Sequence, residues 1–180
     1  MNKIEKHKLA EVVLYILQKT GGIDYYHLFK ILYFAERSHL AKWGHRITSD
    51  NFCALDCGPV PSYLYDIIKG KITDEDCLTN KDFKFAPDDA NYFMIPLRSP
   101  NKEYISKSAL EELDKSINEN ANLPFNQLKI KSHDNAYEKA RKSKKNYKFI
   151  ESVPMAVADG ANEDMANYIQ EQIEIDKALQ

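Results

Sequence analysis

Residues 24–44 read DYYHLFKILYFAERSHLAKWG, and this stretch decides the fold. Asp24 can cap the start of a helix, and Gly44 can end it. An inner stripe repeats with helical spacing and comprises Leu28, Ile31, Leu32, Ala35 and His39. Phe29 and Tyr33 form a second row. Because this helix is apolar over most of its circumference, we expect it to lie at the centre of the protein.

Other segments also have helical patterns. A first helix with an apolar face should end at Gly21-Gly22, and its face comprises Leu9, Val12, Val13, Ile16 and Leu17. Ser108–Glu111 has the spacing of a capping box and should start a helix that continues through Leu110, Leu113 and Ile117. Shorter helical pieces are expected around Leu128 and over Asn135–Lys142, and Asn162 can cap a final helix.

The stretch CGPVPSYLYDIIKG, residues 57–70, is either a reactive loop or a stiff corner that orients a helix. Pro59 and Pro61 hold the residues before them extended, and Pro61 suits the first helical position. Gly70 suits the end of that helix. Residues 51–55 before it form a strand or an extended lead-in. The pattern favours the corner.

Two short β-like runs, 83–85 and 92–97, flank a turn-rich spacer at 87–91 and predict a hairpin in which Pro96 marks an edge strand. The expected fold is therefore mainly α with a small β hairpin (α+β), a compact helical domain built around the central apolar helix. We expect one domain over 1–180, with the β-like insertion near 80–98 and the C-terminal helix from about 162.

Composition excludes several classes of function. The net charge of −2 and the pI of about 6.2 provide no global attraction to nucleic acid or anionic lipid. No apolar run approaches the ~20 residues of a membrane span, and charges interrupt the N-terminus as they would not in a signal peptide. The odd set Cys53, Cys57 and Cys77 fits a reducing cytoplasm, so we expect a cytoplasmic protein without membrane contact.

Candidate catalytic and metal-binding residues are weakly supported. Cys53 and Cys57 lack the second close pair of a zinc site, so we expect no metal. Cys57 precedes a helix start, and His45 or His133 could serve as its base. However, the two prolines remove N–H groups that an oxyanion hole needs. No glycine-rich phosphate loop exists, so we expect no catalytic residue and no cofactor.

The segment 139–148 is the strongest local charge feature. It could bind nucleic acid or an acidic partner, or it could be the solvated end of a helix. Its cations are Lys139, Arg141, Lys142, Lys144, Lys145 and Lys148.

Four motifs, in order, carry a family resemblance: KILYFA at Lys30–Ala35, GHRIT at Gly44–Thr48, GPVP at Gly58–Pro61 and SHDNAY at Ser132–Tyr137. The chain resembles the Panacea domain of the SocA-like antitoxins from bacterial and phage toxin–antitoxin pairs. The resemblance covers most of the chain, including the tail, and is least clear over 71–105. This chain departs from the family where Asp56-Cys57 replace basic and aromatic residues, and where Tyr137 replaces a tryptophan.

The resemblance implies an antitoxin that binds and neutralises a cognate toxin protein, and in one branch of the family the antitoxin delivers the toxin to a protease. On this hypothesis the partner contacts are Tyr25, Tyr26, Trp43, Arg46 and Tyr137. The alternative is a transcriptional regulator that binds nucleic acid through 139–148. Arg37 and Arg46 are also candidates for internal ion pairs with Asp50 or Asp56.

Overall fold

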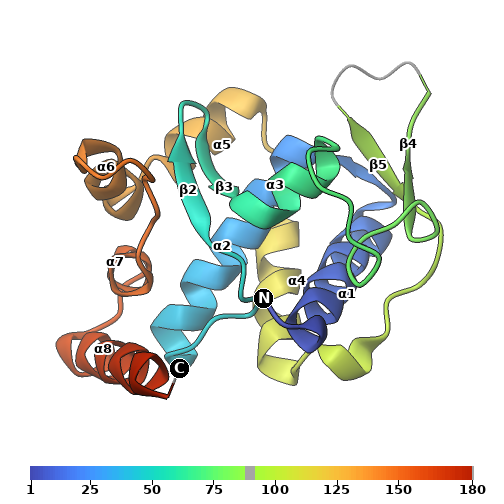
Figure 1. Ribbon diagram of the computed structural model, residues 1–180. Helices are drawn as coiled ribbons and strands as arrows, with labels where there is room; N and C mark the ends of the chain where they lie inside the picture. The colour runs from blue at the N-terminus through green and yellow to red at the C-terminus, as the bar shows by residue number, and fades with distance from the viewer. Residues whose placement is uncertain (88–91, 180) are drawn as a thin grey trace.

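The central helix of the fold is α2, Tyr25–Trp43, in a computed structural model that describes residues 1–87 and 92–179 (Figure 1). The Asp24 side chain accepts from the His27 N–H, and Gly44 ends the helix with a φ of 73°. Its inner stripe is completely buried. The helices that pack on it are α1, Lys3–Thr20; α4, Lys107–Asn120; α5, Phe125–Ser132; α7, Ser152–Ala158; and α8, Glu163–Ala178. The predicted central helix is confirmed.

The first helix, α1, spans Lys3–Thr20 and ends at Gly21, as the periodicity predicts. It packs against α4 and against the short 3-10 helix η1, Lys102–Tyr104. The predicted start of α4 is wrong by two residues, because Ser106 and not Ser108 caps it and accepts from the Ala109 N–H. The Ser108 hydroxyl instead lies 3.0 Å from the Nε2 atom of His39.

One small sheet joins the insertion to the turn before α2. Its strand order is β1, Ile23–Asp24; β5, Phe93–Pro96; and β4, Phe83–Phe85. The predicted hairpin is confirmed, and residues 88–91 of its spacer lie outside the described residues. The prediction of an edge strand at Pro96 is wrong, because β5 is central. Pro96 is tolerated there because β1 pairs only with Phe93 and Met94.

The corner is an antiparallel hairpin followed by a helix. β2, Phe52–Leu55, pairs with β3, Gly58–Pro61, and α3 spans Ser62–Ile68. Pro61 occupies the N-cap position, one residue before its predicted place, and the Asp50 carboxylate accepts from the N–H groups of Tyr63 and Leu64, each at 2.9 Å. The stiff corner is therefore confirmed.

Ion pairs brace α2 against the later helices. The Arg37 guanidinium reaches Asp134, at the start of α6, Asn135–Lys142, at 2.6 Å and Asp159 after α7 at 2.9 Å. Arg46 lies 3.6 Å from the Glu36 carboxylate. The predicted pairing of these arginines with Asp50 or Asp56 is wrong.

None of the helices in the described part of the chain is long and apolar enough to span a membrane.

Candidate partner-binding site

A buried lysine lies beneath the β2–β3 hairpin. Lys30 is 0 % exposed although it carries an amine, and its Nζ donates to the carbonyl oxygen of Pro59 at 2.9 Å. The amine also lies 4.4 Å from the ring centroid of Tyr26, within cation–π distance. Burial lowers the pKa of the Lys30 amine to about 7. The Lys30 side chain thus connects α2 to the β2–β3 hairpin.

Gly58 permits this close approach. Its φ is 107°, which strongly favours glycine, and a Cβ there would lie 2.7 Å from the Ser132 hydroxyl and 3.0 Å from the Cε atom of Lys30. Next to Ser132, the His133 imidazole stacks on Tyr137 with ring centroids 4.1 Å apart. Three of the four motifs therefore meet at one point, the tip of the β2–β3 hairpin, although they are spread over about 100 residues of sequence.

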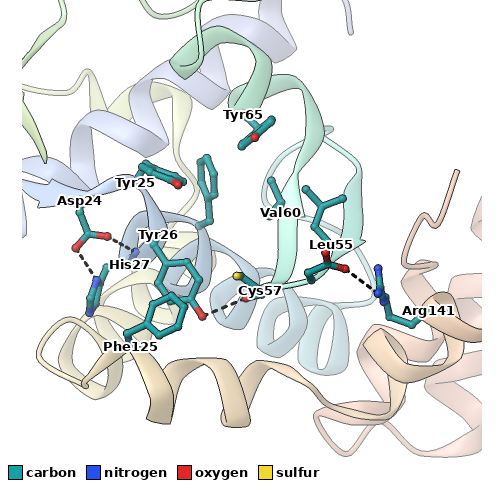
Figure 2. A pocket seen from close by; sticks show the side chains of 12 residues that line it. Asp24, Tyr25, Tyr26, His27, Leu55, Cys57, Val60, Tyr65, Phe125 and Arg141 are labelled. Atoms are coloured by element: carbon teal, nitrogen blue, oxygen red, sulfur yellow. Dashed lines mark hydrogen bonds and ion pairs between the residues drawn. The ribbon is translucent and has the colours of Figure 1, made fainter. Parts of the chain in front are cut away.

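A pocket of about 580 Å³ opens beside this tip (Figure 2). Its volume lies in the range of ligand pockets, roughly 300–1,000 Å³. Its apolar and aromatic lining comes from α2, the hairpin, α3 and α5 and comprises Tyr25, Tyr26, Phe29, Leu55, Val60, Tyr65 and Phe125. The polar lining comprises Asp24, His27, Asp56, Cys57 and Arg141. We call this feature the hairpin pocket.

Hydrogen bonds fix the walls of the hairpin pocket. The Tyr26 hydroxyl donates to the Cys57 carbonyl at 3.1 Å, and its ring lies 4.3 Å from that of Phe125. The Arg141 guanidinium donates to Asp56 at 2.8 Å across the opposite wall. Because the acidic and basic lining residues pair with one another, Asp24 with His27 and Asp56 with Arg141, the aromatic part of the pocket can take an apolar or aromatic side chain of a partner.

An ion pair holds the rim near the start of α2. His27 Nδ1 lies 2.6 Å from the Asp24 carboxylate, and its Nε2 lies 2.9 Å from the Leu123 carbonyl oxygen. The hydrogen bond to Asp24 raises the pKa of His27, although burial opposes the shift. His27 therefore links the N-terminus of α2 to the segment before α5.

The structure separates the predicted contact residues. Tyr25 and Tyr26 both line the hairpin pocket, whereas Trp43 lies at the other end of α2 with 47 % of its surface exposed. Arg46 packs beside Glu36 and over the ring of Phe52. Tyr137 is buried, and its hydroxyl donates to the Leu55 carbonyl. Their role as toxin contacts stays a prediction.

Sequence reasoning missed Tyr65, Leu55 and Phe125 as pocket residues. Each belongs to a different segment, so no local pattern joins them. Phe125 carries one usable signal, because a large aromatic residue directly after Pro124 falls in the first turn of a helix. In the structure its side chain is 45 % exposed. Lys30 carries another, because a lysine inside a run of apolar residues must find a buried acceptor.

The basic segment is partly neutralised. Arg141 pairs with Asp56, Lys142 with Glu138 and Lys145 with Glu151, and the Lys148 ammonium donates to the carbonyl of Arg141. Lys139 and Lys144 form no ion pair with any described residue. The segment therefore presents less free positive charge than its composition indicates.

Neither candidate base contacts the Cys57 thiol. The Nδ1 atom of His45 lies 2.8 Å from the Trp43 carbonyl oxygen, and His133 stacks on Tyr137. Within 1–87 and 92–179, no group of three or more histidine, cysteine or acidic side chains lies close enough to hold a metal ion. The clearest chemical feature of this region is its aromatic pocket.

Comparison with known proteins identifies one family. The family model described as antitoxin SocA-like, Panacea domain, matches residues 28–139, which is more than half of the chain. The matched part runs from α2 to α6 and includes the hairpin and the three motifs at its tip. It leaves out α1, α7 and α8. No curated protein and no solved structure matches the chain.

Proposed function

We propose that this chain, which belongs to the SocA-like antitoxins with a Panacea domain, neutralises a cognate toxin protein by binding it directly. The family match over 28–139 is the observation that carries the proposal. In this mechanism the protein occludes its toxin with a preformed surface and turns over no substrate.

The hairpin pocket is the best candidate for the toxin contact within the matched part. Aromatic side chains in a rigid concave surface are typical of the energetically dominant centre of protein interfaces. Leu55 and Phe125 lie at its edge with 41 % and 45 % of their surfaces exposed. A partner side chain that covers them would bury apolar area on both sides of the interface.

Delivery of the bound toxin to a protease is a finer version of the same function. It needs a second surface that remains free in the complex with the toxin. It would be tested by the lifetime of the toxin in cells that contain or lack this chain, with each candidate protease deleted in turn.

Two measurements test direct binding. Co-expression of this chain should restore growth arrested by the protein encoded next to it, and the two purified proteins should form a complex. Phe125→Ala and Leu55→Ser should each weaken that complex about 10-fold or more, because each removes an apolar contact in the pocket. Ile130→Ser is the matched control, since Ile130 lies on the same helix as Phe125 and is 76 % exposed.

Failure of the two proteins to bind or to restore growth would contradict the proposal. A reaction that the chain catalyses and that Cys57→Ser abolishes would also contradict it.

For the alternative function in transcription, binding of the protein to the promoter of its own gene should weaken steeply with salt, because each neutralised phosphate releases counterions. Three cations of 139–148 pair with acids outside the segment, Asp56, Glu138 and Glu151, and this favours toxin binding over the alternative.

A further inference from the structure

The C-terminal helix α8 is held by side chains between Met165 and Ile173. Ile169 is its one residue buried below a tenth of its surface, and Met165 and Ile173 pack partly against the core. The Tyr168 ring lies against Gly44, where a Cβ would clash with it. Beyond this contact the helix extends along the edge of the molecule (Figure 1). After Ile173, residues 174–179 are all exposed.

An apolar stripe runs along the exposed side of α8. Tyr168, Ile175 and Leu179 are spaced seven and four residues apart, which places them on one face of a helix. They are 46 %, 50 % and 81 % exposed. This spacing is the pattern with which an amphipathic helix enters a groove on a partner.

Acidic side chains accompany the stripe. The helix contains five carboxylates and one lysine, the acids being Glu163, Asp164, Glu171, Glu174 and Asp176. It therefore carries more net negative charge than the whole chain, whose net charge is −2. None of these acids forms an ion pair within the described parts of the chain. Their charge is therefore available to a positively charged partner.

The family match ends at residue 139, before α8 begins. A contact through α8 would accordingly lie outside the matched part, whereas seven of the twelve residues that line the hairpin pocket lie inside it. The charge and the apolar pattern of α8 together define the partner surface that would fit this helix. It has an apolar groove for the stripe and a basic rim for the carboxylates.

We propose that α8 is a recognition helix that lays Tyr168, Ile175 and Leu179 into an apolar groove with a basic rim on the toxin. This inference rests on the proposed function and names the chemistry of the partner. The acidic side chains speed the encounter and fix the orientation, and the apolar stripe slows dissociation. The basic segment of a second copy of this chain is the rival occupant.

The inference is tested with the full chain and the purified protein encoded next to it, by calorimetric titration at about 50 mM and about 500 mM salt. Glu171→Lys/Glu174→Lys should weaken binding about 10-fold at low salt and much less at high salt, because salt screens exposed charges. Ile175→Ser/Leu179→Ser should weaken it about 10-fold at both concentrations.

A matched control is Glu75→Lys/Glu111→Lys, which changes the net charge equally at two exposed positions outside α8. It should bind within about twofold of the unaltered chain. Unchanged affinity in both α8 variants, with a complex still formed, would overturn the inference and leave direct toxin binding intact. No complex with the unaltered chain would overturn both. Self-association of the unaltered chain that the α8 variants lose would assign the helix to a second copy and also overturn the inference.

Discussion

Replacing the buried Lys30 with methionine should change how the stability of this protein depends on pH. The folded-state pKa of Lys30 is about 7, whereas an unburied lysine titrates near 10.5. Between these values the unfolded chain binds more protons than the folded protein, so the free energy of unfolding rises with pH. The cost of the buried charge is fully present below pH 7, and it disappears as pH approaches 10.5.

The size of the effect follows from those two values. Linkage gives a gain of about 3 kcal/mol in the free energy of unfolding between pH 6 and pH 9 for the unaltered protein. Lys30→Met abolishes this gain at position 30. It also leaves the Pro59 carbonyl without its donor, at a cost of about 1–3 kcal/mol that does not depend on pH. The change between the two pH values therefore isolates the titration of the amine.

Urea unfolding at pH 6 and pH 9 measures this change, because the midpoint and slope give the free energy at each pH. Lys139→Met, at an exposed position, is the control for loss of a lysine. If the free energies of unfolding of the unaltered protein and of Lys30→Met differ by the same amount at both pH values, the Lys30 amine stays charged in the folded protein. The account of Lys30 as a desolvated amine held by Pro59 would then be refuted.

Three further predictions concern the same scaffold. Gly58→Ala should lower the free energy of unfolding by about 2–4 kcal/mol, because the new Cβ strains the backbone and overlaps with Ser132. Gly160→Ala is the control: Gly160 has a φ of 91° and open space around it, so the loss should be about 1 kcal/mol. Thermal unfolding measures both, and equal losses would argue against tight packing at Gly58. Asp134→Ala should lower the free energy of unfolding, measured with urea, by about 3–5 kcal/mol, because Arg37 loses one of its two carboxylates and α6 loses its N-cap. A loss below about 1 kcal/mol would contradict the stabilising role of the Arg37–Asp134 ion pair. NMR titration should place the pKa of His27 above 6.5, and Asp24→Asn should lower that pKa. The ion pair therefore stabilises the fold below pH 6.5, and this stabilisation is lost as pH rises through the folded-state pKa of His27. A His27 pKa that Asp24→Asn leaves unchanged would count against the pair.

The sequence predicted the helices and turns well because local chemistry decides them. Asp24, Gly44 and Gly70 each perform the capping or terminating role that their residue types indicate. The errors arose where tertiary contacts compete with local signals. Ser108 lost its capping role to Ser106, and its hydroxyl lies beside buried His39 instead.

The candidate site was less accessible to sequence reasoning. The aromatic side chains of Tyr25 and Tyr26 indicate interface residues, whereas the contact of Tyr26 with Phe125 spans about 100 residues of sequence and has no local signal. Arg37 reaches Asp134 and Asp159 across similar separations, so its partners had no local signature. Pairings of this kind depend on the packing of α2 against α5 and α7, which becomes known only with the fold.

The central position of α2 has a consequence during synthesis on the ribosome. This helix is complete at Trp43, but the last residue of α7, which covers part of it, is Ala158. At about 5–20 residues per second, translation of the intervening chain takes roughly 6–23 s. Throughout that interval at least part of this apolar helix lacks the helices that cover it in the folded protein, so the nascent chain offers an apolar surface to chaperones and proteases.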